Sequence, residues 1–150
     1  MKKLILTLAT IGLSSLAHAE EKKLEITGND ALQYSTKTLE CTTGDKVTVT
    51  LKHVGAQPKQ AMGHNFVLLK SGVTAASFGT KPAVMAAQAT DYIPQDEESK
   101  KQILAHTKLV GGGESDSVTF DAPEPGKYEF LCTFPGHFAL MSGTLTVKAK

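Results

Sequence analysis

The sequence predicts an all-β protein, a Greek-key β-sandwich or barrel with one short helical flap. The clearest strand, residues 46–52, alternates apolar and polar side chains and is rich in β-branched residues. Further short segments of this kind follow along the chain, and turn-rich stretches of Gly, Pro, Asp and Ser separate them. Many short strands with turn signals between them are typical of sandwiches and barrels.

The individual elements follow from local pattern. Residues 65–69 form a continuous apolar run that fits a strand buried on both faces. The helical flap is predicted at residues 82–89, which are rich in Ala, lack Gly and begin with Pro. On that helix Met85, Ala89 and Tyr92 share one stripe, which we expect to cover the sandwich, whereas the charged run 96–101 is predicted to be a solvated loop. The remaining strands are predicted around residues 24–27, 118–120, 128–130 and 145–147.

Residues 1–19 have the pattern of a secretory signal peptide. Two lysines precede an apolar core at residues 4–16, and Ala17-His18-Ala19 is a small-x-small cleavage site. The apolar core is too short for a stop-transfer helix. We therefore expect cleavage after Ala19, a periplasmic location, and a single domain over residues 20–150.

Charge argues against nucleic acid as a partner. The chain has 16 Lys and Arg against 15 Asp and Glu, and every one of its basic residues is Lys. Residues 1–19 hold two of the lysines and no acid, so residues 20–150 carry 14 basic against 15 acidic residues, a net charge of −1. Without Arg there is no bidentate phosphate clamp, and without net positive charge on residues 20–150 there is no counterion-release contribution. Beyond the signal peptide no apolar stretch approaches membrane-spanning length.

The most informative segment is residues 132–141, which place Cys132, His137 and Met141 at the spacing Cys-x4-His-x3-Met. Thiolate and thioether ligands favour Cu(I), imidazole suits both oxidation states, and a Cys with two His and a weak axial Met forms an electron-transfer copper site. A turn at Pro135-Gly136 brings the three side chains together. The fourth ligand is expected from residues 62–65, which contain His64.

Each candidate also has an ordinary structural interpretation. Two cysteines in an exported protein usually form a disulfide, here Cys41 with Cys132. Taken alone, His137 would be a surface loop histidine, His64 a turn histidine and Met141 a core side chain. The copper hypothesis is favoured because these interpretations would all have to coincide in one short loop.

The chain resembles the azurin family of small blue copper proteins (cupredoxins) over nearly all of residues 20–150. The shared segments are residues 28–30, 62–65, 105–109 and 116–121, together with the loop at 132–141. The resemblance implies a cupredoxin-like domain with one type 1 copper, which cycles between Cu(II) and Cu(I). It also implies a monomeric electron carrier, not an enzyme, that serves c-type cytochromes or copper-containing reductases and oxidases through weak, transient contacts.

The same resemblance implies a ligand set. His64, Cys132 and His137 would form the equatorial plane, with Met141 as a long axial ligand. The carbonyl oxygen of Gly63 would lie opposite Met141.

Residues around these ligands also match the family. Asn65 would brace the two ligand segments by hydrogen bonds, and the amide of Phe134 would donate to the Cys132 sulfur. His53 matches a semi-buried histidine beside the site, and it is either a pH-linked group or a hydrogen-bonded strand residue.

An apolar surface is expected around the edge of His137. Such surfaces mark interaction sites, and small interfaces suit partners that separate after each electron transfer. The residues predicted to form it flank the ligands and are uncharged: Met62, Pro135, Gly136, Phe138, Ala139 and Leu140.

The sequence departs from the family pattern at two places. The N-terminal segment lacks the cysteine of the usual disulfide, so Cys41 is unpaired if Cys132 binds metal, and its position beside the turn at residues 42–45 predicts partial exposure. Phe66 stands where these proteins often carry a buried Trp.

Three other functions compete with electron transfer. A periplasmic copper-delivery protein would bind the same metal, and a disulfide-stabilised binding domain would use Cys41 and Cys132 as a bridge. An enzyme with a Cys132–His137 nucleophile pair would need a third orienting residue, and the sequence offers no evident candidate.

Overall fold

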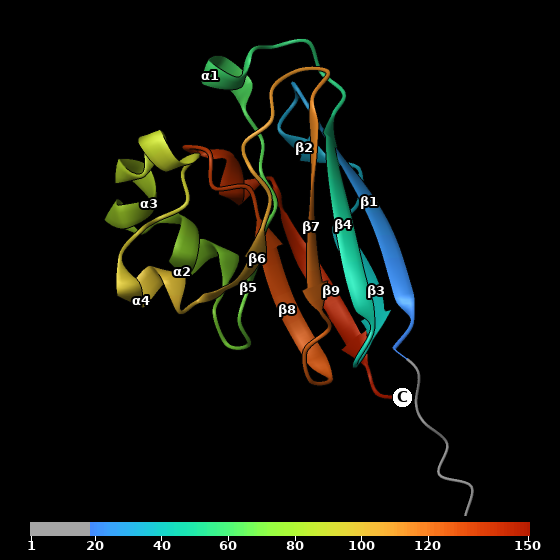
Figure 1. The fold of residues 1–150 in the computed structure, drawn as a ribbon. Coiled ribbons are helices and arrows are strands. Elements are labelled where there is room, and N and C mark those ends of the chain that lie inside the picture. The colour runs from blue at the N-terminus through green and yellow to red at the C-terminus, as the bar shows by residue number, and fades with distance from the viewer. Residues whose placement is uncertain (1–18) are drawn as a thin grey trace, which may run out of the picture.

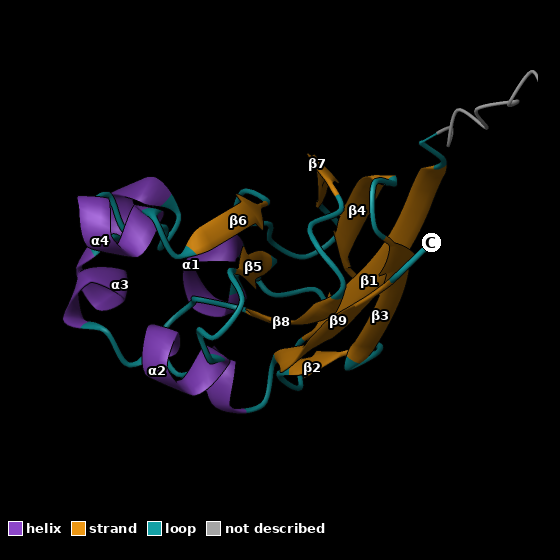
Figure 2. Ribbon diagram, turned by 90° about the horizontal axis from the view of Figure 1, so that it is seen from below, coloured by secondary structure: helices purple, strands orange, loops and turns teal. Residues whose placement is uncertain are grey.

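The computed structural model describes residues 19–150, which form two facing β-sheets with short helices along one side (Figures 1 and 2). Residues 1–18, and with them most of the predicted signal peptide, lie outside the described residues. The first sheet has the order β2-β1-β4-β7, formed by β2 (Gln33–Tyr34), β1 (Glu21–Asn29), β4 (Lys46–His53) and β7 (Ser115–Asp121). The second has the order β3-β9-β8-β5-β6, formed by β3 (Thr38–Thr42), β9 (Ser142–Lys148), β8 (Gly126–Leu131), β5 (Val67–Leu69) and β6 (Ile103–His106).

Two of the strand pairs are parallel. Strands β1 and β4 pair in parallel with Ile26 opposite Leu51, and β3 and β9 pair in parallel with Thr38 opposite Thr144. The other pairs are antiparallel. Parallel neighbours cannot be joined by a hairpin, and between β1 and β4 the chain passes to the second sheet to form β3.

The core lies between the sheets and follows the predicted alternation. In β4 every second side chain from Val47 to His53 is buried, and the residues between them are partly or fully exposed. Phe66 is fully buried with its ring centroid 5.1 Å from that of Phe130, so a phenylalanine packs well at this position. A fully buried aromatic or aliphatic side chain of this kind contributes about 1.5–3 kcal/mol.

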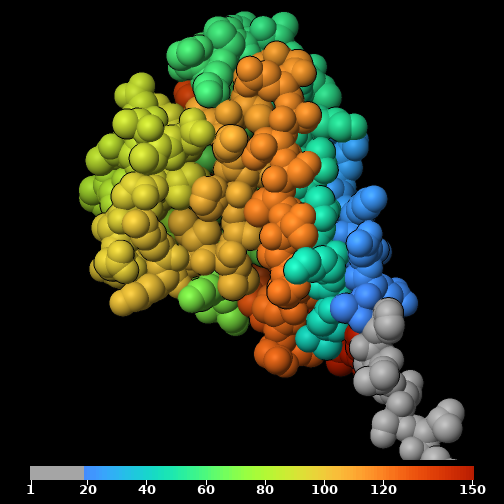
Figure 3. All heavy atoms as spheres, viewed as in Figure 1, coloured from blue at the N-terminus to red at the C-terminus, as the bar shows by residue number. Residues whose placement is uncertain are grey.

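The helical part lies between β5 and β6 and consists of several short pieces. These are α2 (Ala75–Gly79), α3 (Pro82–Ala86), the 3-10 turn η1 (Gln88–Thr90) and α4 (Glu97–Lys100). Figure 3 shows this segment, yellow-green to gold, as a lobe against the side of the sandwich. A second apolar cluster joins Phe78, Val84 and Ile93 of this lobe to β5 and to Leu131. The fold class is confirmed, with a helical region that is longer and more divided than the single flap expected.

Two local predictions in this region are wrong. Met85 is 51% exposed and Ala89 is exposed, while Val84 is buried. The expected stripe requires one helix that reaches Tyr92, but α3 ends at Ala86 and the chain turns there. The charged run at 96–101 contains α4, because the side chain of Asp96 accepts a hydrogen bond from the amide of Ser99 at 2.9 Å and caps a helical turn.

Both cysteines are free thiols in the interior. Cys41 lies on the inward face of β3, opposite Val147, and is 4% exposed. The prediction of partial exposure was wrong because the strand continues through Cys41 and the turn begins only after it. The Cys41–Cys132 bridge of the competing hypothesis is not formed.

Within residues 19–150, none of the helices has both the length and the apolar character that crossing a membrane requires.

Candidate metal centre

The predicted ligands meet at the end of the sandwich opposite the C-terminus, near α1 (Lys59–Met62) in Figure 1. His64 follows α1 and is held by an isolated bridge to Val110, in which His64 N donates to Val110 O at 2.9 Å and Val110 N returns a bond of 2.8 Å. The connection between β8 and β9 supplies the other predicted ligands. The antiparallel pairing of β5 with β8, in which Val67 lies opposite Leu131, brings these two distant segments side by side.

The loop between β8 and β9 is closed by its own backbone. Cys132 N donates to Met141 O at 2.9 Å, and Met141 N donates to His137 O at 2.8 Å. Gly136 has φ +80°, a left-handed conformation that glycine adopts without strain, and a 3-10 turn η2 (His137–Ala139) follows it. This reversal points the side chains of Cys132, His137 and Met141 into the interior, where each is at most 4% exposed.

Three potential ligand atoms converge there. The donor atoms of His64, Cys132 and His137 all lie within 4.8 Å of one another, and this is the one such cluster among the described residues. The Cys132 sulfur is 3.7 Å from His137 Nδ1 and 3.9 Å from the carbonyl oxygen of Gly63. Gly63 therefore presents its carbonyl to the same space.

One atom of this cluster lacks a partner within the described part of the chain. His64 Nε2 lies 2.9 Å from the carbonyl oxygen of Asn29, which fixes that nitrogen as the donor. His64 Nδ1 is then an unprotonated acceptor, and it is buried without a hydrogen-bond partner. A buried lone pair without a donor costs free energy unless something binds it. A metal ion would satisfy it, and the Asn29 carbonyl then supports the ligand histidine from behind.

Met141 borders the same space. It is fully buried, and a Cβ placed on Gly28 would lie 2.6 Å from His64 Cδ2 and 3.3 Å from Met141 Cε. The side chains of Met141 and His64 thus both pack against the backbone of Gly28. A glycine is needed there because any larger residue would displace the ring.

Burial sets the protonation state of the metal-free site. Burial raises the pKa of the Cys132 thiol to about 12, although backbone hydrogen bonds from Asn65 and Phe134 partly oppose it. Burial, together with the neighbouring His64 and His53, lowers the pKa of His137 to about 4, and burial also lowers the pKa of His64. Without a metal ion, the site would therefore hold a neutral thiol and two neutral imidazoles at neutral pH. A bound cation would replace the thiol proton and stabilise the thiolate.

Asn65 joins the two ligand-bearing segments. Its Nδ2 donates to Thr133 Oγ1 at 2.7 Å and to Asp91 O at 2.9 Å, and its Oδ1 accepts from Thr133 N at 2.8 Å. The hydroxyl of Tyr34 donates to the Asn65 carbonyl at 2.5 Å. Asn65, the residue after His64, is therefore hydrogen-bonded to Thr133, the residue after Cys132, and to Tyr34.

His53 supports the ligand His64 by stacking. The ring centroids are 4.3 Å apart and the planes differ by 15°. The amide of Gly55 donates to His53 Nδ1 at 3.0 Å, so Nε2 carries the proton and donates to Met62 O at 2.8 Å. Of the two roles considered for His53, the hydrogen-bonded strand histidine matches this geometry.

Aromatic side chains surround His137, near where the apolar surface is predicted. Phe134 packs on His137 with ring centroids 4.6 Å apart, and Tyr92 meets Phe134 edge-on at 5.1 Å. Leu140 is 54% exposed. Of the other residues expected there, some are exposed and some half-buried: Met62, Pro135, Gly136, Phe138 and Ala139. Phe138 also packs against the second apolar cluster, so part of it belongs to the core.

Sequence reasoning did not assign a role to several residues that shape the site. Thr133 and Tyr34 act through hydrogen bonds between segments distant in sequence, and no local pattern predicts such bonds. Asp91 and Tyr92 are consecutive residues with left-handed φ of 57° and 60°, which place the Asp91 carbonyl on Asn65. The packing of Gly28 against the His64 ring is evident only from the structure, because the two residues are distant in sequence.

The donor set fits a copper ion. Two imidazole nitrogens, a thiol that becomes a thiolate and a neighbouring thioether constitute the arrangement of a type 1 site, and the unpartnered His64 Nδ1 indicates where a metal would bind. Cys with two His also suits zinc.

Comparison with known proteins gives the same answer. A family model described as "Copper binding proteins, plastocyanin/azurin family" matches residues 20–148. Azurin of Pseudomonas aeruginosa is 44% identical over 151 residues, covering 94% of this chain and 97% of that protein. Outer membrane protein H.8 of Neisseria gonorrhoeae is 45% identical over 125 residues, which cover 81% of this chain but only 65% of that longer protein.

Solved structures agree. Auracyanin from Roseiflexus castenholzii, in a reduced state, superposes with a TM-score of 0.73 at 36% identity, over 86% of this chain and 98% of that one. Auracyanin A of Chloroflexus aurantiacus, described as a "blue" copper protein, gives 0.72 at 34% identity, over 84% and 98% of the two chains.

Proposed function

The chain belongs to the plastocyanin/azurin family of copper-binding proteins, and from this we propose that it is a periplasmic one-electron carrier with a single type 1 copper. The observation that supports this most directly is the buried cluster of His64, Cys132 and His137, in which His64 Nδ1 has no partner among the described residues. Copper bound there supplies a one-electron couple between Cu(II) and Cu(I).

The protein's own contribution is to hold the ligands still. Backbone bonds close the loop from Cys132 to Met141, Asn65 ties both ligand segments together, and Asn29 and His53 fix the ring of His64. Ligands that cannot relax keep one geometry in both oxidation states. An electron carrier needs a site whose ligands rearrange little between oxidation states. A copper-delivery protein must release its ion and does not need such a rigid site.

Electron exchange is proposed to occur at the His137 edge. His137 is 4% exposed, whereas His64, Cys132 and Met141 are fully buried. The apolar residues around it would exclude water from a short-lived contact with a c-type cytochrome or a copper-containing reductase or oxidase. The buried donor atoms leave no open position for a substrate, which supports a carrier over an enzyme.

The periplasmic location rests on the sequence of residues 1–19. The n-region, apolar core and Ala17-His18-Ala19 site support export and cleavage after Ala19.

Titration of the metal-free protein with Cu(II) tests the proposal. We expect an intense blue colour that saturates at one ion per chain, because it arises from charge transfer out of the Cys132 thiolate. Cys132→Ser should abolish the colour, and a zinc-loaded sample should be colourless. An unchanged absorption in Cys132→Ser, or copper that leaves the protein on each reduction cycle, would rule out the electron-carrier assignment.

A further inference from the structure

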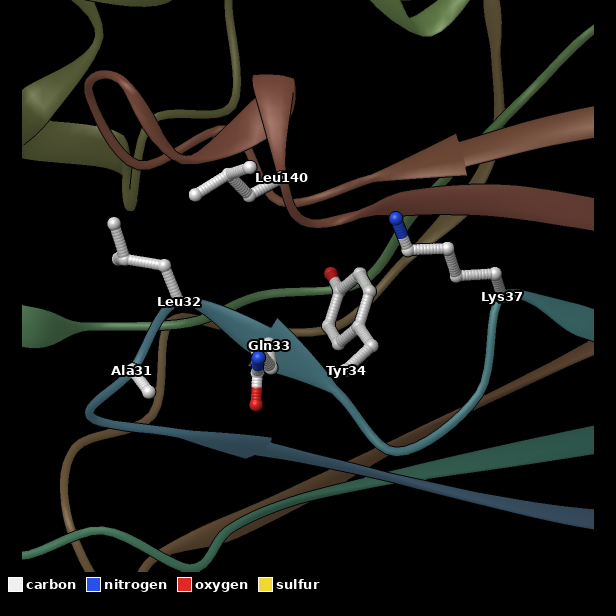
Figure 4. A pocket seen from close by; sticks show the side chains of 6 residues that line it. All are labelled: Ala31, Leu32, Gln33, Tyr34, Lys37 and Leu140. Atoms are coloured by element: carbon white, nitrogen blue, oxygen red, sulfur yellow. The ribbon is translucent and has the colours of Figure 1, made fainter.

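Tyr34 is a buried tyrosine beside the metal centre that supplies no ligand atom. It lies in β2 and is 7% exposed, and one side of its ring lines a small pocket together with Leu32, Lys37 and Leu140 (Figure 4). Its hydroxyl points away from β2 and donates to the carbonyl oxygen of Asn65 at 2.5 Å, in the interior. In the described part of the chain, Tyr34 is the one hydrogen-bond donor to this carbonyl.

The position of the Tyr34 ring is fixed by both its backbone and its packing. Tyr34 lies opposite Gly28 in the pairing of β1 with β2, and the next residue, Ser35, donates its amide to Thr27 O at 2.9 Å. The ring packs against that of the fully buried Phe130, with centroids 5.8 Å apart. A tyrosine held in this way directs its hydroxyl to one place, and a buried tyrosine hydroxyl needs a partner there.

Asn65 connects this hydroxyl to the sulfur of the site. Burial raises the pKa of the Cys132 thiol, and the Asn65 amide is one of two backbone donors whose hydrogen bonds to the sulfur oppose that effect. The Asn65 side chain is held by Thr133 and Asp91, so its backbone carbonyl is held by Tyr34 alone. Without the hydroxyl, the buried carbonyl would lack a partner, and the Asn65 backbone would turn towards another donor.

The Tyr34 hydroxyl remains a donor at any ordinary pH. Burial, and after it the charge of the nearby Cys132, raises the pKa of Tyr34 well above its usual value. The hydroxyl therefore keeps its proton. Both groups lie in the interior, where hydrogen bonds and charges act more strongly on one another than they do in water.

We propose that Tyr34 is a positioning residue of the metal centre, which holds the Asn65 backbone so that the Asn65 amide donates to the Cys132 sulfur and thereby raises the reduction potential. The proposal rests on the proposed electron-carrier function and adds a residue that tunes it. The sulfur carries more negative charge beside Cu(I) than beside Cu(II), because Cu(I) withdraws less electron density from it. A hydrogen bond to the sulfur therefore favours the reduced state.

Tyr34→Phe tests this by removing the hydroxyl and keeping the ring. The variant should still bind copper and turn blue, but its reduction potential should fall and its blue absorption should shift. Tyr128→Phe is the matched control, because Tyr128 is also 7% exposed and its hydroxyl donates to the carbonyl of Glu124 at 2.7 Å, before the start of β8. Both variants lose one bond from a buried tyrosine to a backbone carbonyl, so both should be less stable to denaturant, whereas the potential should change only in Tyr34→Phe.

The zinc-loaded protein gives a second measurement that does not depend on electron transfer. Zinc suits a site of one Cys and two His and is diamagnetic, so NMR can report the amide proton of Asn65. In Tyr34→Phe this proton should move upfield, because its hydrogen bond to the sulfur is longer, and in Tyr128→Phe it should not move.

The results separate the role of Tyr34 from the carrier function. A potential in Tyr34→Phe equal to that of the parent protein, or an equal fall in both variants, would overturn the proposal. A lower potential with an unmoved Asn65 amide proton would also overturn it, since the effect would then bypass Asn65. A parent protein that does not cycle between Cu(II) and Cu(I) would contradict the carrier function, and the zinc-loaded proteins would still show whether Tyr34 positions the Asn65 amide.

Discussion

Asn65 and Thr133 exchange two hydrogen bonds in the interior, one from Asn65 Nδ2 to Thr133 Oγ1 and one from Thr133 N to Asn65 Oδ1. Each residue directly follows a predicted metal ligand, His64 in one case and Cys132 in the other. The pair therefore sets the separation of the two ligand segments even before a metal binds.

Asn65→Ala should lower the free energy of unfolding of the metal-free protein by about 2–4 kcal/mol, because it leaves buried groups on Thr133 and Asp91 unsatisfied. Chemical denaturation measures this. Thr133→Val is the matched control; it removes only the hydroxyl, keeps the bond from Thr133 N, and should cost about 1 kcal/mol. An equal loss of unfolding free energy in the two variants would show that the other hydrogen bonds of the Asn65 side-chain amide do not stabilise the site.

Gly28→Ala should disturb the metal centre from outside the ligand set. The new Cβ would lie 2.6 Å from His64 Cδ2, so the imidazole must move away from its position between Gly28 and His53. We expect weaker copper binding and a shifted blue absorption. Gly126→Ala is the control, since its Cβ would meet its first neighbour at 3.6 Å, and a normal spectrum in both variants would contradict the proposed packing.

Met141→Leu should retain copper and colour but raise the reduction potential. Removing a weak thioether donor disfavours Cu(II) relative to Cu(I), and leucine fills a similar volume in this fully buried position. Voltammetry of the protein measures the change. Complete loss of copper would mean that Met141 is a primary ligand.

Leu140→Asp should slow electron exchange with a c-type cytochrome and also slow self-exchange between copies, with the copper spectrum intact. The charge would lie on the apolar surface beside His137 and would have to be desolvated in each encounter. Met85→Asp introduces the same charge at a methionine that is 51% exposed, close to the 54% of Leu140, but on α3. Equal rates in the two variants would place the docking surface elsewhere.

The metal-free protein should lose stability as the pH falls from about 6.5 to about 4. The pKa of His137 is lowered to about 4 by burial, so the unfolded chain takes up its proton first and acid favours unfolding. For this histidine alone the full effect is on the order of 3 kcal/mol. Denaturation at a series of pH values measures it, and His137→Asn should show a shallower loss over the same range. A parallel loss in both proteins would assign the effect to other groups.

The parts of this structure that are predictable from sequence are those encoded locally. Strand β4 follows from its alternation, and the convergence of Cys132, His137 and Met141 follows from one short loop with a tight turn. The burial of Cys41 could not be predicted, because it depends on pairing with Val147 in a distant strand. The exposure of Met85 was missed because nothing in the Ala-rich run signals that the helix ends at Ala86.

The hydrogen bonds that hold the ligand segments were also hard to predict from sequence, because they join residues that are distant along the chain. The resemblance led to Asn65, but its partners Tyr34, Asp91 and Thr133 come from three other segments. The left-handed conformation at Asp91 suits an aspartate, but the same conformation at Tyr92 is uncommon for a bulky residue and has no local sequence signal.

The parallel pairing of β3 with β9 has a kinetic consequence. Thr38 meets Thr144, so one edge of the second sheet is completed only after nearly the whole described chain is in place. Contacts so distant in sequence slow folding, because the entropy of closing the chain is lost before any contact compensates for it. Cys41 is covered only when this pairing has formed, so its thiol is accessible to oxidants in the unfolded chain. A reductant present during refolding should therefore raise the yield of monomer.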